Sequence, residues 1–470
     1  MLKASNIHYE AGGRQQGIAH GGIGIIHKLS QKTGLISELD SGLKLLKRYV
    51  PYHESDHILN MAYNIIAGGD CLQDIELLRN DEAWLNALGA EIIPDPTTAG
   101  DFLRRFDERT IVKLMDIKNT IRKKVWDRQP QNFKKEAVIN IDGTICETTG
   151  ECKQGMDISY NGKWGYAPLV ISLANTREPL YIINRSGNAP SHLGSAEWID
   201  KTLDLLKGSF EKVVVRGDTD FSLTSNFDRW DDRCDFLFGM DARKNLYKLA
   251  AQIPEKAWGR FGKEPRVNKT AQKRVRPSNV KDQVVKRRKF KNLKTECEHV
   301  AEFDYKPGQC QKAYRMIVLR KKIKVLKGEL NLLDDIRYFF YITNDRKKSI
   351  HQLVNLYRKR ADHENDIEQL KNGVKAMNNP SNTLISNWAY MVIASLAWDL
   401  KAWFGLLMPY RKLGNHIVRM EFKRFIRVFI NIPCLIIKAG RKIKYRLVGY
   451  NDQIKHVFNF LSQMRSFCFT

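Results

Sequence analysis

The stretch Ala137-Val-Ile-Asn-Ile-Asp142 decides the fold of this chain, because a mainly helical pattern ends before it and a series of strands begins with it. It is a short apolar run that ends on an acid, which is typical of a buried strand. The pattern then continues with strands at 168–174 and 179–184, a helix at about 194–207, and strands at 212–218 and 234–239. The sequence therefore predicts an α/β region.

The order of these segments predicts how the strands lie in the sheet. The first three strands follow one another closely and can be antiparallel neighbours, whereas the later two each need a helical crossover. This is the order of a ribonuclease-H-like mixed sheet. Asp142 and Asp218 each end a strand, and ligands of α/β sheets gather at strand ends, so the two acids could meet at one place. Alternatively, each acid could simply cap a turn.

The segment before this region, residues 1–130, is predicted to be a helical N-terminal domain. Amphipathic runs cover Ser37–Tyr49 and His53–Ala67, and a third begins near Thr97 or Thr98 and continues to Val125-Trp126. In a protein that acts on DNA, this domain would be a candidate for DNA binding.

Residues 243–345 interrupt the α/β region and are predicted to form a β-rich insertion, with strands at 313–320 and 338–343. Between Lys256 and Lys294 the chain carries 15 Lys or Arg residues against Glu264 and Asp282, a net charge of +13. Such density favours contact with a nucleic-acid backbone over an ordinary solvated loop. The candidate DNA-binding residues in it are Trp258, Lys273, Arg274, Lys286, Arg287 and Arg288.

Residues 357–371 contain no Gly or Pro and are predicted to form one helix that begins near Lys348. On a continuous helix, Tyr357, Arg360, Glu364 and Lys371 would share an arc of about 60°. A carboxylate between two cations suits a metal-bound phosphodiester, although a solvated face with ion pairs is the ordinary alternative. An apolar helix from Leu384 to Leu407 follows, and its tryptophans are predicted to lie in the core.

The α/β core is thus assigned to residues 131–242 and 346–400, and residues 401–470 to a basic α/β C-terminal region for DNA contact or dimerisation. That region includes a predicted hairpin at 434–447 that turns near Gly440. The whole chain of 470 residues has a net charge of +26, which indicates a polyanionic partner such as nucleic acid. Its eight cysteines form no CxxC pair, no apolar run is long enough to span a bilayer, and we expect a cytoplasmic protein.

Three carboxylates stand out: Asp142, Asp218 and Glu364. Oxygen ligands of this kind bind Mg²⁺ or Mn²⁺, and two such ions about 4 Å apart can promote phosphodiester displacement. Asp220 competes with Asp218 for this role, because on a continuing strand it would lie on the same face. Glu368 competes with Glu364, because it lies only about 40° away on the helix.

The sequence resembles the DDE transposases of bacterial insertion sequences. The resemblance rests on Asp142-Gly-Thr, on Arg216-Gly-Asp-Thr-Asp-Phe221, and on the spacing Tyr357-x2-Arg360-x3-Glu364-x6-Lys371, which is the Tyr-Arg-Glu-Lys signature of one branch. It covers about residues 20–460, and Asn161-Gly162 followed by Pro168-Leu suggests the IS-thirteen-eighty group. At position 220 this chain has Asp where the family more often has Gly.

The resemblance implies a ribonuclease-H-like catalytic core and cut-and-paste transposition. Asp142, Asp218 and Glu364 would hold two Mg²⁺ or Mn²⁺ ions, while Tyr357, Arg360 and Lys371 would hold phosphates. Activated water would nick the transposon end, and the freed 3′-hydroxyl would act through a hairpin and then attack target DNA. Trp258 is the candidate for stacking on a flipped base. The partners would be double-stranded DNA, as terminal inverted repeats and target, and a second subunit in a synaptic dimer. The bacterial protein would join the nucleoid when acting.

Two alternatives remain from the sequence. A repurposed transposase that binds DNA without catalysis would keep the same charge pattern. A phosphatase of the haloacid-dehalogenase type has Asp-x-Asp-Gly-Thr, but this chain has Asn140 at the position of the nucleophile and Ser222 where a later Asp is expected. Loss of the nucleophile argues against that chemistry.

Overall fold

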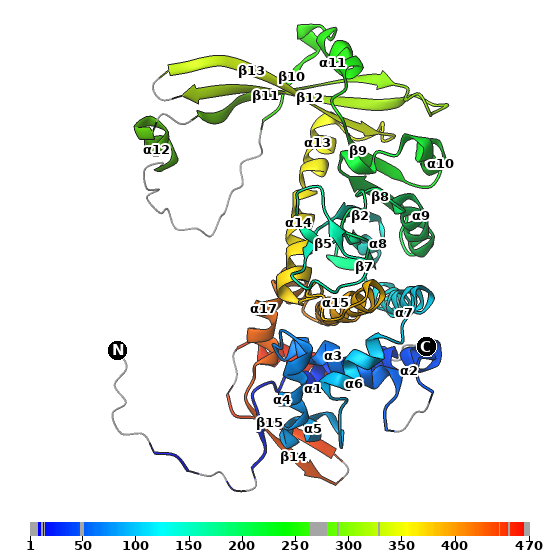
Figure 1. Ribbon diagram of the computed structural model, residues 1–470, viewed down its shortest axis with the longest axis vertical. Helices are drawn as coiled ribbons and strands as arrows, with labels where there is room; N and C mark the ends of the chain where they lie inside the picture. The colour runs from blue at the N-terminus through cyan, green and yellow to red at the C-terminus, as the bar shows by residue number, and fades with distance from the viewer. Residues whose placement is uncertain are drawn as a thin grey trace.

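The structure is a computed structural model that describes residues 8–10, 13, 15–47, 51–262, 280–288, 291–327, 330–440, 442–449 and 452–464. The chain folds into an elongated α/β molecule (Figure 1), with the insertion at one end, helices at the other, and the first core strands between them. Within the described ranges, no helix is long and apolar enough to cross a membrane.

The centre of the molecule is a large mixed sheet whose strand order is β10-β11-β12-β13-β9-β8-β2-β6-β7. The core strands are β2 (Glu136–Gly143), β6 (Leu169–Leu173), β7 (Glu178–Ile183), β8 (Lys212–Gly217) and β9 (Asp235–Met240). The first three pair antiparallel, and β8 and β9 run parallel to β2. Helix α9 (Ser195–Leu206) connects β7 to β8, and α10 (Phe227–Asp231) lies between β8 and β9. The predicted strand order is therefore confirmed, with strand bounds that differ by at most a residue or two.

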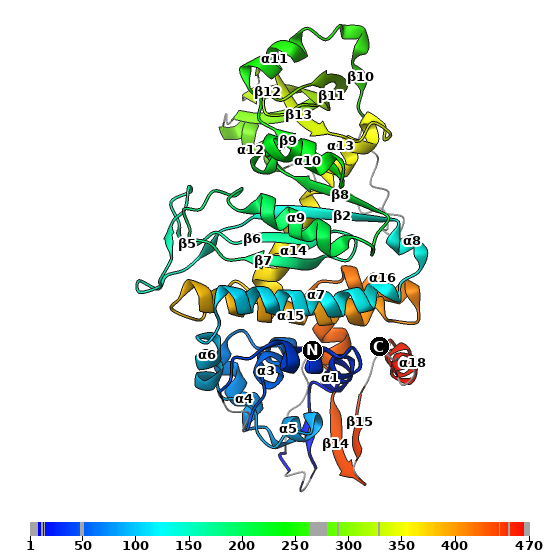
Figure 2. The same ribbon diagram turned by 90° about the vertical axis from the view of Figure 1, so that its right-hand side faces the viewer.

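The insertion extends this same sheet. Its long strands are β11 (Lys291–Tyr305), β12 (Tyr314–Lys327) and β13 (Leu330–Thr343), and β13 pairs antiparallel with β9. The insertion also contains α11 (Lys244–Ala251), β10 (Gly259–Arg260) and α12 (Val280–Arg288). The sequence analysis recognised parts of β12 and β13 but missed β11. Because a paired strand joins the insertion to β9, its position relative to the core is fixed by backbone hydrogen bonds (Figure 2).

A small second sheet projects beside the core, with the order β3-β5-β4. Its strands are β3 (Cys146–Glu147), β4 (Asp157–Ile158) and β5 (Trp164–Tyr166). The turn between β4 and β5 contains the predicted Asn161-Gly162 pair, and Gly162 has a φ of +78°, which an L side chain adopts with strain.

The N-terminal helices and the C-terminal region pack together at the other end of the molecule (Figure 1). Strand β1 (Gly17–Ile18) pairs with β14 (Cys434–Ala439), which forms the predicted hairpin with β15 (Lys442–Leu447). The helices here are α1 (Ile23–Lys32), α2 (Leu35–Gly42), α3 (Glu54–Ile66), α4 (Ile75–Arg79), α5 (Glu82–Leu88), α6 (Pro96–Leu103), α7 (Glu108–Asp127), α15 (Leu384–Leu406), α16 (Arg411–Arg419), α17 (Phe422–Phe425) and α18 (Ile454–Met464). The short helix α8 (Gln131–Lys134) lies beside the core strands instead (Figure 1).

Two helix predictions in this part were wrong in their bounds. The run 37–49 ends as helix at Gly42, after which Leu43 is extended. The run from 97 to 126 is divided into α6 and α7, because Asp107 accepts a hydrogen bond from the backbone N–H of Thr110 and starts a new helix. Helix α6 begins at Pro96, one or two residues earlier than predicted, and its cap is Asp95.

A buried cluster of charges joins the helical part to the core sheet. Arg122 of α7 donates to Glu178 of β7 at 3.0 Å and to Asp399 of α15 at 2.7 Å. Lys118 lies 3.0 Å from the other oxygen of Asp399, and Trp403 donates to Glu178. The arginine and both acids are fully buried, so each charge depends on its partner for the solvation that water would give.

Candidate active site

Asp142 and Asp218 lie side by side where two neighbouring parallel strands end. Strands β2 and β8 are in register through Asn140 and Arg216, and each acid follows its register residue by two positions. Asp218 also caps the short 3-10 helix at 219–221, accepting a hydrogen bond from Asp220 N–H at 3.0 Å. The structure thus brings the two acids to one place, and Asp218 caps a turn as well.

The two carboxylates repel each other in a partly desolvated setting. Burial and the charge of Asp218 raise the pKa of Asp142 to about 6, and the charge of Glu364 adds to the rise. Burial raises the pKa of Asp218 as well, and the nearby charges of Asp220 and Asp241 act in the same direction. A site that raises carboxylate pKa values in this way favours a bound cation, because the cation would relieve the repulsion.

Arg360 is the cation that this structure places among the acids. Its Nη1 donates to Oδ2 of Asp142 at 3.0 Å. Burial lowers the pKa of Arg360, but the charges of Asp142, Asp218 and Glu364 outweigh burial and leave it raised. The sequence analysis expected Arg360 to hold a phosphate, whereas in this structure it is the counter-ion of a candidate metal ligand.

The predicted single helix through residues 357–371 was wrong, and Arg216 is the physical reason. The structure has α13 (Ile350–Arg358), α14 (Ala361–Glu368) and a π-helix at Gln369–Gly373. The carbonyl of Leu356 accepts a hydrogen bond from Arg216 Nη1 at 2.5 Å, and the N–H of Arg360 turns to Tyr357 instead. A side chain inserted into the helical ladder bends a helix at that point.

Arg216 is itself held from the core sheet. Its Nε donates to the side chain of Asn140 on β2 at 2.5 Å, and it is almost fully buried. On α14, His363 packs inward against β6 through a contact with Ser172 Oγ at 3.0 Å, and burial lowers its pKa to about 3, so it is neutral. These contacts fix the start of α14, and with it Arg360 and Glu364, against the strand ends.

Glu364 and its competitor Glu368 differ in their surroundings. Both are exposed on α14. The charge of Glu364 acts on Asp142 and on Arg360, which places it at the site. Glu368 accepts a hydrogen bond from the side chain of Asn372, one turn further along. The surroundings thus favour Glu364 as the third acid.

Tyr357 and Lys371 also lie beside the acids. Tyr357 packs with its ring centroid 4.3 Å from that of Tyr341, and its hydroxyl lies close over the backbone of Gly239. Burial and the charges of Asp218 and Asp142 raise its pKa. Lys371 donates to the carbonyl of Ile145 at 2.9 Å, just beyond Asp142 in the chain.

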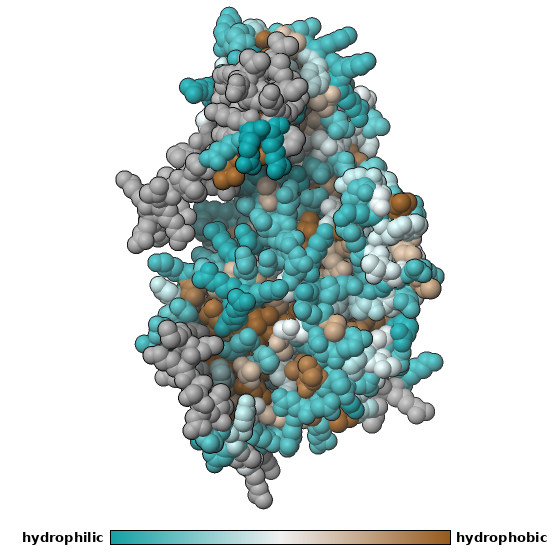
Figure 3. All heavy atoms as spheres, turned by 60° about the vertical axis from the view of Figure 1, so that its left-hand side comes forward, coloured by the Kyte–Doolittle hydropathy of each residue, from teal (hydrophilic) through white to brown (hydrophobic). Residues whose placement is uncertain are grey.

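A pocket of about 820 Å³ lies beside the two aspartates. Asp142, Asp218, Asp220 and Lys371 line it, together with the loop 187–192 and the turn at 160–163. Figure 3 shows a hollow at mid-height on one face of the molecule, with mostly hydrophilic side chains around it. A polar pocket of this size beside paired acids suits a charged substrate.

Arg185 is a pocket residue that sequence reasoning missed. Its guanidinium donates to the carbonyls of Ala167, Pro190, Ser191 and Leu193, and it thereby shapes the loop 187–192. Among the residues that the structure describes, its Nη2 has no hydrogen-bond partner. Burial lowers its pKa to about 10, so it is a cation at neutral pH. The sequence around it, Arg185-Ser-Gly-Asn188, gave no signal of this role.

The remaining candidate DNA-binding residues lie in the insertion. Trp258 is only 9% exposed, and the guanidinium of Arg320 lies 4.2 Å from its ring centroid, so it is not an open stacking surface in this structure. Arg287 and Arg288 are exposed on α12, which also contains Lys286. Lys273 and Arg274 lie outside the described residues.

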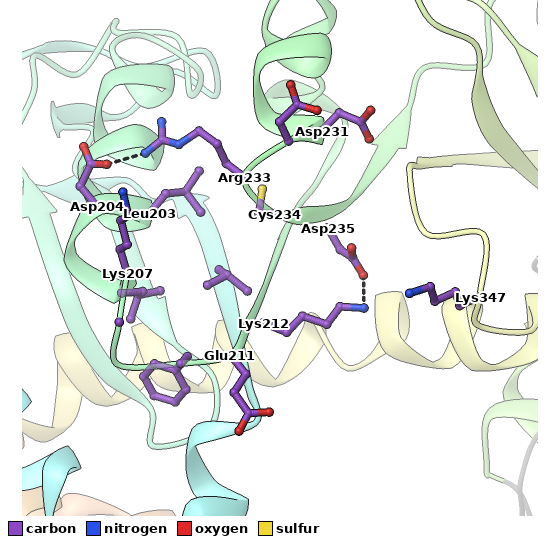
Figure 4. A pocket seen from close by; sticks show the side chains of 15 residues that line it. Leu203, Asp204, Lys207, Glu211, Lys212, Asp231, Arg233, Cys234, Asp235 and Lys347 are labelled. Atoms are coloured by element: carbon purple, nitrogen blue, oxygen red, sulfur yellow. Dashed lines mark hydrogen bonds and ion pairs between the residues drawn. The ribbon is translucent and has the colours of Figure 1, made fainter.

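A second pocket, of about 720 Å³, lies at the opposite end of the same strands (Figure 4). It is lined by residues at the starts of β8 and β9, including Lys212 and Asp235. Its charges are paired with one another, as Lys212 with Asp235 and Arg233 with Asp204. Because the acids at the strand ends are far along the sheet from it, this pocket is not part of the candidate site.

The fit of this site to a divalent cation depends on the side-chain atoms that would bind the ion. The donor atoms are all carboxylate oxygens, which suit Mg²⁺ or Mn²⁺. The pKa values of Asp142 and Asp218 are raised by burial and by the charges of neighbouring acids, and a bound cation would offset that repulsion. Across the described part of the chain, however, no three His, Cys, Asp or Glu side chains approach closely enough to form a metal site. The type of ligand atom therefore fits Mg²⁺ or Mn²⁺, but Glu364 does not lie close enough to Asp142 and Asp218 to form a site of three ligands.

One comparison with known proteins shows the family of this chain. A family model described as transposase DDE domain group 1 matches residues 1–466. No protein of curated function matches the chain. Among solved structures, the chain is similar to the cryo-EM structure of a piggyBac transposase synaptic complex with hairpin DNA, at 13% identity and a TM-score of 0.36, over 87% of this chain and 84% of that one.

Proposed function

Because this chain belongs to the family described as transposase DDE domain group 1, we propose that its strand-end acids cut and rejoin DNA during cut-and-paste transposition of an insertion sequence. The observation that carries the proposal is the pairing of Asp142 and Asp218 in one polar pocket with Arg360 and Lys371 beside them. The paired acids can bind a metal ion, and the adjacent cations can bind the negatively charged backbone of a phosphodiester substrate.

Asp142, Asp218 and Glu364 would hold two Mg²⁺ or Mn²⁺ ions, with Asp220 as the nearest competing ligand. When bound, the ions would activate the attacking hydroxyl and stabilise the leaving oxygen. Glu364 is exposed on α14 and its charge acts on Asp142, so it would be the third ligand.

The chain's own cations would position the DNA. Arg360, which pairs with Asp142 in the free protein, would bind a backbone phosphate of the DNA, because a guanidinium binds carboxylate and phosphate alike. Lys371, at the pocket wall, would hold a second phosphate of the same strand. Tyr357 would support Arg360, whose guanidinium carbon lies 5.9 Å from the Tyr357 ring centroid.

Finer assignments belong to the same proposal. The strand order β7-β6-β2-β8-β9 supports a ribonuclease-H-like core. The spacing of Tyr357, Arg360, Glu364 and Lys371 supports the Tyr-Arg-Glu-Lys branch and the IS-thirteen-eighty group, and with them a hairpin intermediate. The helical N-terminal domain and the basic C-terminal region would bind the terminal inverted repeats, within a synaptic dimer.

A cleavage assay tests this function. The substrate is a duplex that carries the inverted repeat flanking the gene, with a scrambled repeat as its control. We expect nicking at the repeat end that needs Mg²⁺ or Mn²⁺ and disappears in Asp218→Asn, while gel-shift binding of the repeat persists. Binding without any metal-dependent cleavage by the wild-type protein would instead identify a repurposed DNA-binding protein.

A further inference from the structure

The turn between β4 and β5 presents an aromatic ring at the edge of the candidate site. Tyr160 is 94% exposed, and it lines the same pocket as Asp142 and Asp218. At this exposure the ring makes little contact with the rest of the protein, so burial of the ring against a ligand would break few existing contacts. Single exposed apolar residues are common on proteins, so exposure alone does not indicate a ligand. The relevant observation is the position of Tyr160 at the pocket.

The turn that carries Tyr160 is held in one conformation. The backbone N–H of Ser159 donates to Lys163 O at 2.8 Å, and that of Gly162 donates to Ser159 O at 2.8 Å. The Ser159 hydroxyl donates to the carbonyl of Lys163 at 2.7 Å. Because the turn is closed by these bonds and by the positive φ of Gly162, Tyr160 would lose little backbone freedom on binding a ligand.

The sheet that carries this turn is also tied to the core. Lys153 donates to Ser381 O at 2.8 Å, Gln154 N–H to Asn382 O at 2.7 Å, and the Tyr166 hydroxyl to Gln154 O at 2.9 Å. Gly187 allows the loop beside the pocket to pass close to β4, since a Cβ there would lie 2.2 Å from Asp157 O. The position of Tyr160 relative to the acids is thus set by the fold.

The cations in the pocket walls indicate one part of the ligand. Lys371 and the buried Arg185 supply positive charge to the walls, and Arg185 has only carbonyl partners for its bonded nitrogens among the described residues. Phosphate is the group that such cations attract, and a planar base is the group that stacks on an exposed tyrosine ring. Phosphate and base together make a nucleotide.

We propose that Tyr160 stacks on a DNA base adjacent to the phosphate that lies against Asp142 and Asp218. This rests on the proposed function and gives the stacking role to the β4–β5 turn in place of the covered ring of Trp258. The base would sit on the phenol ring, while the cations of the pocket hold the phosphates on either side.

Fluorescence of 2-aminopurine tests the stacking separately from catalysis. The probe is the inverted-repeat duplex with 2-aminopurine at successive positions across the cut site, bound in EDTA so that no cleavage occurs. We expect quenching at one position with the wild-type protein and with Tyr160→Phe, and loss of that quenching with Tyr160→Ala. With Mg²⁺ present, Tyr160→Ala should lower kcat/KM about tenfold, the scale of one base–aromatic stack.

Trp164→Ala is the matched control, because Trp164 is 54% exposed on the same hairpin but does not line the pocket. It should leave the quenching and kcat/KM unchanged, and neither variant should shift the thermal unfolding temperature. Wild-type quenching and cleavage in Tyr160→Ala would overturn the stacking and leave the transposase function standing. Tyr160-dependent quenching without cleavage by the wild-type protein would keep the stacking and overturn that function. Equal losses in both variants would also overturn the assignment to Tyr160.

Discussion

The guanidinium of Arg360 lies against the carboxylate of Asp142, with Nη1 and Oδ2 3.0 Å apart. The two residues are 218 positions apart in the chain and meet because Arg216 bends the helix just before Arg360. The pair means that the free protein already contains a cation at the place where a metal ion would bind. The same guanidinium would also suit a backbone phosphate, because it binds carboxylate and phosphate alike.

Removal of Arg360 should change the titration of Asp142. The charge of Arg360 lowers the pKa of Asp142 against burial and the charge of Asp218, and the balance is about 6. Arg360→Met should therefore move that pKa further upward, as observed by ¹³C NMR of labelled aspartates in the metal-free protein. The exposed neighbour Lys359 offers a control of equal charge, and Lys359→Met should leave the pKa unchanged. An unmoved pKa in Arg360→Met would mean that the ion pair does not form in solution.

Asp142 should make the protein less stable as pH rises. Its folded-state pKa, about 6, lies above the ordinary value of 3.8. The protonated form therefore favours folding at low pH, and this stability is lost as pH rises through the window from about 4 to 6. In metal-free buffer at pH 7, Asp142→Asn should raise the free energy of unfolding by about 2–3 kcal/mol, since one pKa unit is worth about 1.4 kcal/mol.

Urea unfolding at pH 4 and pH 7 measures this effect. The gain in Asp142→Asn should be present at pH 7 and largely absent at pH 4. Asp101→Asn, at an exposed site on α6, should change stability little at either pH. A gain of equal size at both pH values would show that it does not come from the charge.

The buried charge cluster should contribute strongly to stability. Glu178→Ala removes the partner of Arg122 and the acceptor of the Trp126 and Trp403 indoles, and leaves a buried arginine with one partner fewer. We expect a loss of about 3–5 kcal/mol in unfolding free energy, the range for a broken buried ion pair. Glu76→Ala, which breaks an exposed pair with Arg79, should cost under about 1 kcal/mol. Similar losses in both variants would contradict the assigned role of burial.

Binding of DNA should weaken steeply with salt, because the chain carries a net charge of +26. If α12 contacts the DNA backbone, Arg287→Ala with Arg288→Ala should reduce the slope of log K against log salt by up to about 2, one for each lost phosphate contact. Arg229→Ala, whose side chain pairs with Asp200 at 2.7 Å, serves as a control and should leave the slope unchanged. If the affinity of the wild-type protein for DNA did not change with salt, its net charge would not explain DNA binding.

The core of the fold could be predicted because its signals are local. Apolar runs such as 137–142 and 212–218 become buried strands, and the acids that end them lie together because parallel neighbours end at the same edge. Strand β11 was missed because polar and charged residues interrupt its apolar pattern, for example at Lys294-Thr-Glu-Cys-Glu298. Its pairing with β12 depends on the partner strand, which no local pattern reveals.

The details of the site depended on contacts between distant residues. Arg216 breaks the helix at Leu356 from 140 positions away, so helical periodicity alone predicted one straight segment. Trp258 was proposed as an open ring, but Arg320 of β12 covers it. Arg185 and Tyr160 belong to loops whose place at the pocket is set by packing, and composition gives no sign of it.

The most direct test of the account compares Glu364→Gln with Glu368→Gln in metal-dependent cleavage of the inverted-repeat duplex. Both substitutions remove one exposed carboxylate from α14 and keep the side-chain shape, and gel-shift binding of the same duplex shows whether the DNA is still held. We expect that Glu364→Gln abolishes cleavage while it keeps DNA binding, and that Glu368→Gln cleaves like the wild-type protein. Full cleavage by Glu364→Gln, above all with an inactive Glu368→Gln, would contradict the account.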